Sequence, residues 1–121
     1  MAESHSLGKK GEELAAGHLK EKGYKILHRN WKSGKMELDI VAENNESVVF
    51  VEVKTRSENF LADAKDTVPK EKQRFMLFAA ENYIKRYNIN KDSRFDIITV
   101  ISKGQNFTIE HLENAFYPTL R

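Results

Sequence analysis

The spacing of apolar and polar residues along the chain predicts two helices and five strands in one domain spanning residues 1–121. Apolar positions recur at helical spacing over residues 6–22, where Gly23 follows, and again after Pro69. Strands are indicated by alternating or uninterrupted apolar runs at 24–31, 36–42, 47–56, 94–101 and 106–112. The order helix, three strands, helix, two strands predicts an α/β protein with a mixed central β-sheet flanked by helices.

The connections between these elements limit the topology of the sheet. Residues 43–46 form a short polar link containing Asn44 and Asn45, which favours an antiparallel hairpin. The helix after Pro69 is long enough to serve as a crossover, so the strand at 94–101 is expected to pair in parallel with that hairpin. The strand at 106–112 is expected at the edge of the sheet, and the polar residues 56–67 are expected to form a loop.

Within the elements, periodicity assigns side chains to faces. In the strand at 36–42, Leu38, Ile40 and Ala42 are expected on one face and Glu37, Asp39 and Val41 on the other. In the second helix the predicted buried stripe favours a core role over base stacking for its aromatic residues. That stripe consists of Phe75, Phe78, Ala79, Asn82, Tyr83 and Arg86.

The most apolar strand carries two charges, which a merely buried strand would avoid because an unpaired charge in a dry interior costs several kcal/mol. Glu52 and Lys54 alternate with Val51 and Val53, so both point to the same side, and the hairpin brings Asp39 beside them. Two carboxylates at one place are oxygen ligands suited to Mg²⁺ or Mn²⁺, and a lysine beside them can assist attack on a phosphate. The alternative is a simple ion pair between Glu52 and Lys54.

The first helix contributes another acidic candidate. Glu12 lies at the margin of the apolar stripe and can reach inward, whereas Glu13 points to solvent. It can support the metal site, or it can complement the helix dipole as an N-terminal charge.

Composition narrows the class of protein. The 121 residues contain no cysteine, which excludes disulfides and thiolate zinc sites, and four scattered histidines are expected to be surface or packing residues. No apolar segment has the length of a signal peptide or a membrane span, so we expect a cytoplasmic protein without membrane contact.

Charge is distributed unevenly along the chain. The net charge is +2, yet residues 36–66 hold eight acidic and three basic residues between more basic flanks. That distribution suits a polyanion whose phosphate approaches a metal held by carboxylates.

Several blocks in order along nearly the whole chain resemble the small YraN-like family of predicted endonucleases, within the PD-(D/E)xK superfamily of restriction endonucleases and Holliday-junction resolvases. The blocks are Gly8-x-x-Gly11-Glu12-x-x-Ala15, Gly23-Tyr24-x-Ile26-Leu27-x-x-Asn30, Glu37-Leu38-Asp39-Ile40, Phe50-Val51-Glu52-Val53-Lys54-x-Arg56, Lys72 and Arg94-Phe95-Asp96. One departure is Met36, where the family usually has glycine before its Glu-x-Asp block.

The resemblance implies a restriction endonuclease-like fold and a Mg²⁺- or Mn²⁺-dependent endodeoxyribonuclease. Its implied catalytic set is Glu12, Asp39, Glu52 and Lys54, with Glu12, Asp39 and Glu52 at the metal. DNA is the implied partner, branched or repair intermediates are the implied substrates, and a homodimer is an allowed assembly. The basic residues expected to contact nucleic acid are Lys9, Lys10, Arg56, Lys70, Lys72 and Arg74.

Two other classes of function stay open at this point. A catalytically inactive nucleic-acid-binding module on the same fold would bind nucleic acid with or without divalent metal. A housekeeping domain with an edge-strand ion pair would bind neither nucleic acid nor metal. Asp96 is expected to be structural, pairing with Arg94 or a neighbouring strand.

Overall fold

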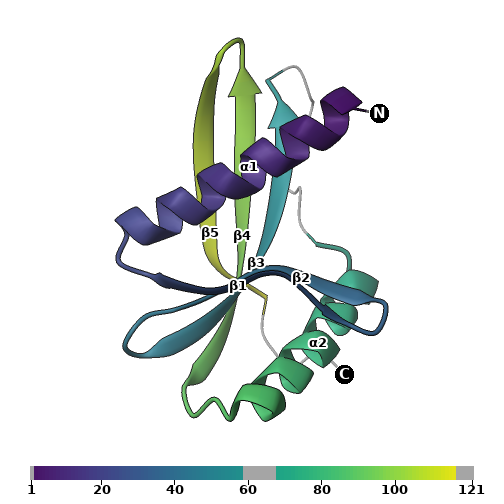
Figure 1. Ribbon diagram of the computed structural model, residues 1–121, viewed down its shortest axis with the longest axis vertical. Coiled ribbons are helices and arrows are strands. Elements are labelled where there is room, and N and C mark those ends of the chain that lie inside the picture. The colour runs from purple at the N-terminus through teal and green to yellow at the C-terminus, as the bar shows by residue number, and fades with distance from the viewer. Residues whose placement is uncertain (1, 59–67, 117–121) are drawn as a thin grey trace.

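The computed structural model describes residues 2–58 and 68–116, with side chains from residue 7 onward. Within these residues it has the predicted order of elements (Figure 1), namely α1 (Ala2–Glu21), β1 (Lys25–Ser33), β2 (Met36–Glu43), β3 (Ser47–Ser57), α2 (Lys70–Tyr87), β4 (Asp92–Lys103) and β5 (Asn106–Phe116). The predicted loop at 56–67 begins too early, because Arg56 and Ser57 extend β3. The rest of that loop, residues 59–67, lies outside the described residues.

Both helices end where a residue adopts a left-handed backbone conformation. Gly23 has φ +94°, and the N–H of Tyr24 donates to the carbonyl of Leu19 at 2.9 Å. At the end of α2, Asn88 has φ 53°, and the N–H of Ile89 donates to the carbonyl of Ile84 at 3.0 Å. These bonds satisfy carbonyls at the helix ends. Neither α1 nor α2 is long and apolar enough to cross a bilayer.

The five strands lie side by side in the order in which they occur along the chain. Every neighbouring pair is antiparallel except β3 and β4, which are parallel and joined through α2 as predicted. The hairpin between β2 and β3 is fixed by the Asn44 side chain, whose Oδ1 accepts hydrogen bonds from the N–H groups of Glu46 and Ser47 at 2.9 and 2.8 Å. Strand β5 forms one edge of the sheet and is longer than predicted.

Figure 1 shows the two helices packed on the sheet, and the sheet separates two apolar cores, one containing residues of α2 and the other residues of α1. Strand β3 contributes side chains to both cores, because successive side chains of a strand point to opposite faces of the sheet. Val48 and Phe50 pack with α2, whereas Val49 and Val51 pack with α1. All four residues are fully buried. The alternation continues to Glu52, which therefore follows Phe50 on the α2 side of the sheet.

The predicted core stripe of α2 is wrong for two of its aromatic residues. Phe75 and Phe78 are 49% and 58% exposed, whereas Tyr83 is buried as expected. The helix instead buries the stripe Met76, Ala79, Ala80 and Tyr83. The small side chains of Ala79 and Ala80 suit a close approach to the sheet, and each exposed phenylalanine lies about 100° around the helix from a buried neighbour.

The predicted face of Leu38 is also wrong. Leu38 packs with Val41 in the core beneath α2, while Ile40 and Ala42 pack beneath α1. Strand β2 pairs with β3 only from Ile40 to Glu43, and its earlier residues pair with β1 alone. Two-stranded ribbons twist strongly, so the alternation read along β2 does not hold relative to the rest of the sheet.

Candidate functional site

The candidate site lies where β2 turns away from β3. Ile40 is the first β2 residue that pairs with β3, opposite Val51, and Asp39 directly precedes it in the chain. The Oδ2 of Asp39 accepts a hydrogen bond from the backbone N–H of Val53 at 2.9 Å. The Asp39 carboxylate therefore accepts a hydrogen bond of the kind that a β2 backbone carbonyl would accept if the pairing of β2 with β3 continued. This bond holds the carboxylate at the opening between the two strands.

Glu52 is the second carboxylate at this opening. It is only 7% exposed, and it forms an ion pair with the Nζ of Lys72, from the first turn of α2. Lys72 itself is half exposed. The contact was not predicted, because it joins a strand to a helix 20 residues further along the chain.

The electrostatics of the opening are dominated by its acidic groups. Burial raises the pKa of Asp39 to about 7, and the negative charges of Glu52 and then Glu12 add to the increase, although the Val53 hydrogen bond opposes it. Close carboxylates raise one another's pKa because both cannot ionise without repulsion. A proton or a cation beside Asp39 would therefore be favoured at neutral pH.

Glu12 reaches this region because α1 packs closely on the end of β3. Gly11 is buried, and a Cβ at that position would meet the Oγ1 of Thr55 at 2.1 Å. The absence of a side chain at position 11 therefore permits the close approach of helix and strand. Glu12 follows directly, and its charge acts on Asp39 as described above, which agrees with the predicted inward position.

Two clefts meet at Glu52. The first, which we name the lysine cleft, has a volume of about 710 Å³ and lies between the start of α1, the end of β3 and the start of α2. Its lining includes Glu12, Glu52, Lys54, Arg56 and Lys72. Lys54 is 9% exposed, so its aliphatic stem is covered. Glu12, Glu52 and Lys54, three members of the predicted catalytic set, thus line one cleft.

The second cleft, which we name the phenylalanine cleft, has a volume of about 720 Å³ and lies between β2 and α2. Its lining is Lys35, Met36, Glu37, Asp39, Glu52, Pro69, Glu71, Lys72, Phe75 and Met76. Asp39, the remaining member of the predicted set, is found here. Glu52 and Lys72 line both clefts, and so connect all four predicted residues.

The donor atoms at the opening fit a hard cation that keeps much of its water. Asp39 and Glu52 offer carboxylate oxygens, and the described residues that line the two clefts include neither histidine nor cysteine, which is the ligand chemistry of Mg²⁺ or Mn²⁺. Among residues 7–58 and 68–116, no three His, Cys, Asp or Glu side chains converge into a set that would hold a metal by themselves. The geometry therefore fits a site with two protein carboxylates completed by water or phosphate.

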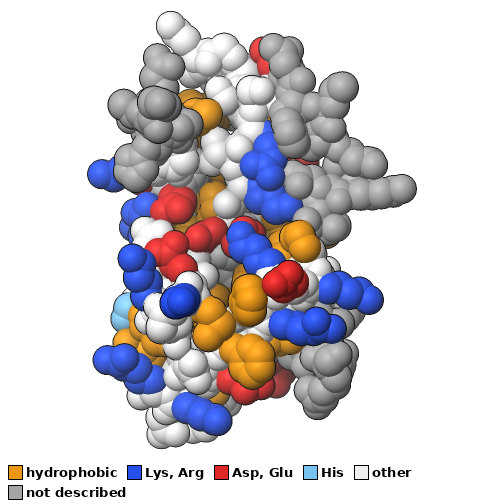
Figure 2. Space-filling model, turned by 90° about the vertical axis from the view of Figure 1, so that its right-hand side faces the viewer, with side chains coloured by type: hydrophobic (Ala, Val, Ile, Leu, Met, Phe, Trp, Pro, Cys, Tyr) orange, Lys and Arg blue, Asp and Glu red, His pale blue; other side chains and the backbone are white. Residues whose placement is uncertain are grey.

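The basic residues predicted to contact nucleic acid are brought together only in part. Arg56 and Lys72 line the lysine cleft, and Lys9 lines a neighbouring cleft with Glu12. Lys10, Lys70 and Arg74 are exposed and line none of these three clefts. On the face beside α2, acidic side chains gather centrally with basic ones around them (Figure 2).

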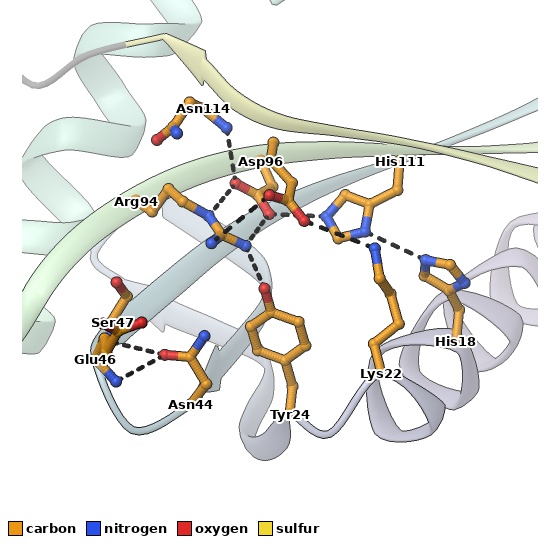
Figure 3. A network of polar contacts seen from close by, with 11 residues as sticks. His18, Lys22, Tyr24, Asn44, Glu46, Ser47, Arg94, Asp96, His111 and Asn114 are labelled. Atoms are coloured by element: carbon orange, nitrogen blue, oxygen red, sulfur yellow. Dashed lines mark hydrogen bonds and ion pairs between the residues drawn. The ribbon is translucent and has the colours of Figure 1, made fainter.

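Away from the clefts, a buried polar network surrounds Asp96 (Figure 3). Arg94 forms an ion pair with Asp96 at 2.8 Å, as predicted, and His111 contacts the same carboxylate at 2.8 Å. His111 also contacts His18 of α1 at 3.2 Å. These two histidines are 93 residues apart, so their spacing along the chain gave no sign of the contact.

The fold and the clefts define a mixed α/β protein whose sheet opens between two strands around a pair of carboxylates. The chain belongs to the uncharacterised protein family UPF0102, whose model matches residues 11–100. The matched range includes Glu12, Asp39, Glu52 and Lys54.

Relatives of this chain extend over its whole length. It is 51% identical over 120 residues to a UPF0102 protein of Bacteroides fragilis, with 99% of each chain covered. It is 45% identical over 120 residues to a UPF0102 protein of Phocaeicola vulgatus, again with 99% of each covered. A UPF0102 protein of Flavobacterium johnsoniae is 43% identical over 121 residues, covering 97% of this chain and 98% of that protein.

Proposed function

We propose that this protein is a Mg²⁺- or Mn²⁺-dependent endonuclease that hydrolyses phosphodiester bonds in DNA, on a restriction endonuclease-like fold formed by one domain of residues 1–121. The observation that carries the proposal is the opening between β2 and β3. There, Asp39 lies near the negative charges of Glu52 and Glu12, and Lys54 lines the adjoining cleft with Glu52. A carboxylate pair facing a phosphate would repel it, so a cation between them is the arrangement that makes chemical sense.

Each residue of the site has a role in this proposal. Asp39 and Glu52 hold the metal, and Glu12 supports it or a water bound to it. When bound, the metal supplies positive charge at the phosphate and lowers the pKa of its water. Lys54 stabilises the negative charge that develops on the phosphate oxygens during attack. The reaction adds water across one P–O ester bond and leaves one phosphate end and one hydroxyl end.

Arg56 and Lys72 supply positive charge along the lysine cleft, where they would contact phosphates on either side of the bond that is cut. The ion pair between Lys72 and Glu52 shows that Glu52 already attracts a cation. To contact a phosphate, Lys72 would leave Glu52, whose carboxylate would then be available to the metal.

One observation favours the alternative of a nucleic-acid-binding module without catalysis. The ammonium group of Lys72 neutralises the charge of Glu52, so one of the two carboxylates at the opening already has a positive partner from the protein. Such a module would bind DNA through its basic residues in the presence or absence of divalent cation.

The test is cleavage of labelled single-stranded, duplex, flap and four-way-junction DNA in Mg²⁺, Mn²⁺ or EDTA. Wild type is compared with Asp39→Asn, and with Asp92→Asn as a matched control because Asp92 is exposed at the start of β4. Metal-dependent cutting by wild type and Asp92→Asn, reduced at least about 100-fold in Asp39→Asn, supports the proposal. Metal-independent binding without cutting by any of the three proteins favours the binding module.

A further inference from the structure

Exposed aromatic side chains gather on α2. Among the described residues four large hydrophobic side chains are exposed, and three of them, Phe75, Phe78 and Tyr87, are aromatic residues of this helix. In Figure 2 hydrophobic side chains also gather next to the acidic centre of the face beside α2. Apolar surface left in water is unfavourable, and a contiguous patch of it marks a place where a ligand or partner binds.

Phe75 differs from the other two because it lines the phenylalanine cleft. Glu71, Lys72, Phe75 and Met76 form the α2 wall of that cleft, at the i, i+1, i+4 and i+5 spacing of one helix face. Met36 lies on the opposite wall, from β2. The cleft therefore has apolar walls in one part, and Asp39 and Glu52 in another.

The same cleft contains groups suited to both parts of a nucleotide. Lys35 and Lys72 carry positive charge for a phosphate, and Asp39 and Glu52 are the proposed metal ligands. The half-exposed aromatic ring of Phe75 offers a flat apolar surface of the kind on which a base stacks, and Met36 adds apolar surface on the opposite wall. A volume of about 720 Å³ is within the roughly 300–1,000 Å³ of sites that take small ligands.

A paired base is already stacked on its neighbours, so its face is not available to a side chain. A base that is unpaired can turn out of the strand and stack on an aromatic ring. We propose that the phenylalanine cleft binds an unpaired nucleobase next to the bond that is cut, with Phe75 stacking on the base. The inference rests on the proposed function, and it assigns that function to substrates with single-stranded nucleotides at the cleavage site.

A second copy of this chain is a less suitable occupant. The exposed parts of Phe75 and Phe78 together amount to about 160–270 Å², given a full side-chain area of roughly 150–250 Å² each. A stable dimer buries about 800 Å² on each partner. The position of Phe75 beside charged groups of both signs also suits a nucleotide better than an apolar interface.

The experiment compares Phe75→Ala and Phe75→Leu with Phe78→Ala. Phe78 is the matched control, because it is an exposed phenylalanine of the same helix that does not line the cleft. Leucine keeps apolar bulk but cannot stack as a ring does. Affinity is measured with Ca²⁺ in place of Mg²⁺, using a single strand that contains 2-aminopurine and a duplex of the same sequence, and cleavage of both is measured in Mg²⁺.

We expect Phe75→Ala and Phe75→Leu to bind the single strand about 5- to 100-fold more weakly than wild type, and to lose the quenching of 2-aminopurine. Their weak binding to duplex should not change, and Phe78→Ala should stay within about twofold of wild type. Circular dichroism and the melting temperature should be unchanged, since both residues are exposed.

The outcomes separate the two proposals. If wild type cuts and Phe75→Ala behaves as wild type on the single strand, the base site is wrong while the nuclease stands. If wild type cuts nothing but Phe75→Ala selectively weakens single-strand binding, the base site stands and the nuclease is wrong. If wild type does not bind the single strand, or if both alanine variants convert a dimer into monomers in sedimentation, the base site is overturned.

Discussion

Asp39 and Asp96 are the same kind of residue in neighbouring regions of one sheet, yet their surroundings are opposite. Asp96 is fully buried and receives hydrogen bonds from Arg94, His111 and the N–H of Asn114, at 2.8–3.1 Å. Burial alone would raise its pKa, but the bonds from His111 and Arg94 hold that pKa below its usual value. Asp39 has the N–H of Val53 as a donor, and its nearby charged groups include Glu52 and Glu12.

The difference shows how a structural carboxylate is distinguished from one prepared for a cation. Around Asp96 the protein itself supplies the opposite charge, so the ionised form stabilises the fold (Figure 3). Around Asp39 burial, and after it the neighbouring acids, raise the pKa to about 7, so the ionised form is disfavoured compared with that of an exposed aspartate. Groups whose pKa is displaced in this way are common at functional sites, because a ligand provides the charge that the fold does not.

The largest expected effect on stability comes from Asp96. Asp96→Ala would remove the fully buried partner of Arg94 and His111 and leave Arg94 only the longer contact with Glu113 at 3.9 Å, and breaking a buried pair costs about 3–5 kcal/mol. The free energy of unfolding in urea should fall by that amount. The exposed control Asp92→Ala should stay within about 0.5 kcal/mol of wild type. A decrease of less than about 1 kcal/mol in the free energy of unfolding of Asp96→Ala would contradict a structural role for Asp96.

Asp39→Asn should act in the opposite direction. In EDTA at pH 8 the variant should be about 1–3 kcal/mol more stable than wild type, because it removes a strained charge and its amide oxygen still accepts from Val53. The lower stability of the native protein is expected, because residues that bind ligands often reduce the free energy of unfolding. Urea unfolding of both proteins measures the difference.

The pH dependence of that difference follows from the sign of the shift. The folded pKa of Asp39, about 7, lies above its unfolded value of 3.8, so the folded state binds the proton more tightly between these values. Wild type should therefore lose stability relative to Asp39→Asn as the pH rises from 4 to 7, and the gap should be constant above that range. A difference in stability between the two proteins that does not widen with pH would contradict the raised pKa of Asp39.

Burial and the charge of His111 lower the pKa of His18. Both proteins should therefore lose stability as the pH falls below 6.5, the unfolded value for this group.

The smallest effect concerns Lys72. Since its side chain is half exposed, Lys72→Met should change the free energy of unfolding by less than about 1 kcal/mol. Affinity for Mn²⁺ should rise a few-fold, because the ammonium group no longer competes for Glu52. Titration calorimetry with Lys70→Met as control measures this, since Lys70 is exposed on the same helix and lines neither cleft. Weaker Mn²⁺ binding in Lys72→Met alone would show that Lys72 does not compete with the cation.

Much of the fold could be predicted because its signals are local. The apolar run of β3, the asparagine turn before it and the length of the helical crossover are each visible within a few residues, and together they indicate the hairpin and the parallel pair. The association of Asp39, Glu52 and Glu12 followed from the same hairpin and from the face of α1. Their proximity was predicted correctly, while their roles stay predictions.

What the sequence did not reveal depends on contacts between distant segments. The contact between His18 and His111 depends on α1 crossing β5, and the ion pair of Lys72 with Glu52 depends on where α2 begins over the sheet. The exposure of Phe75 and Phe78 could have been suspected, because the predicted stripe also contained Asn82 and Arg86. A stripe with fewer polar members, Met76, Ala79, Ala80 and Tyr83, was available in the same helix.

The most direct test of the cation site is the melting temperature of wild type and Asp39→Asn during titration with Mn²⁺ and Mg²⁺. A ligand that binds only the folded state stabilises it by about 2.7 kcal/mol at 100 times its dissociation constant. We predict a melting temperature that rises by several degrees with metal in wild type and in Asp92→Asn, and stays constant in Asp39→Asn. No rise in wild type, or an equal rise in Asp39→Asn, would contradict a metal site at Asp39 and Glu52.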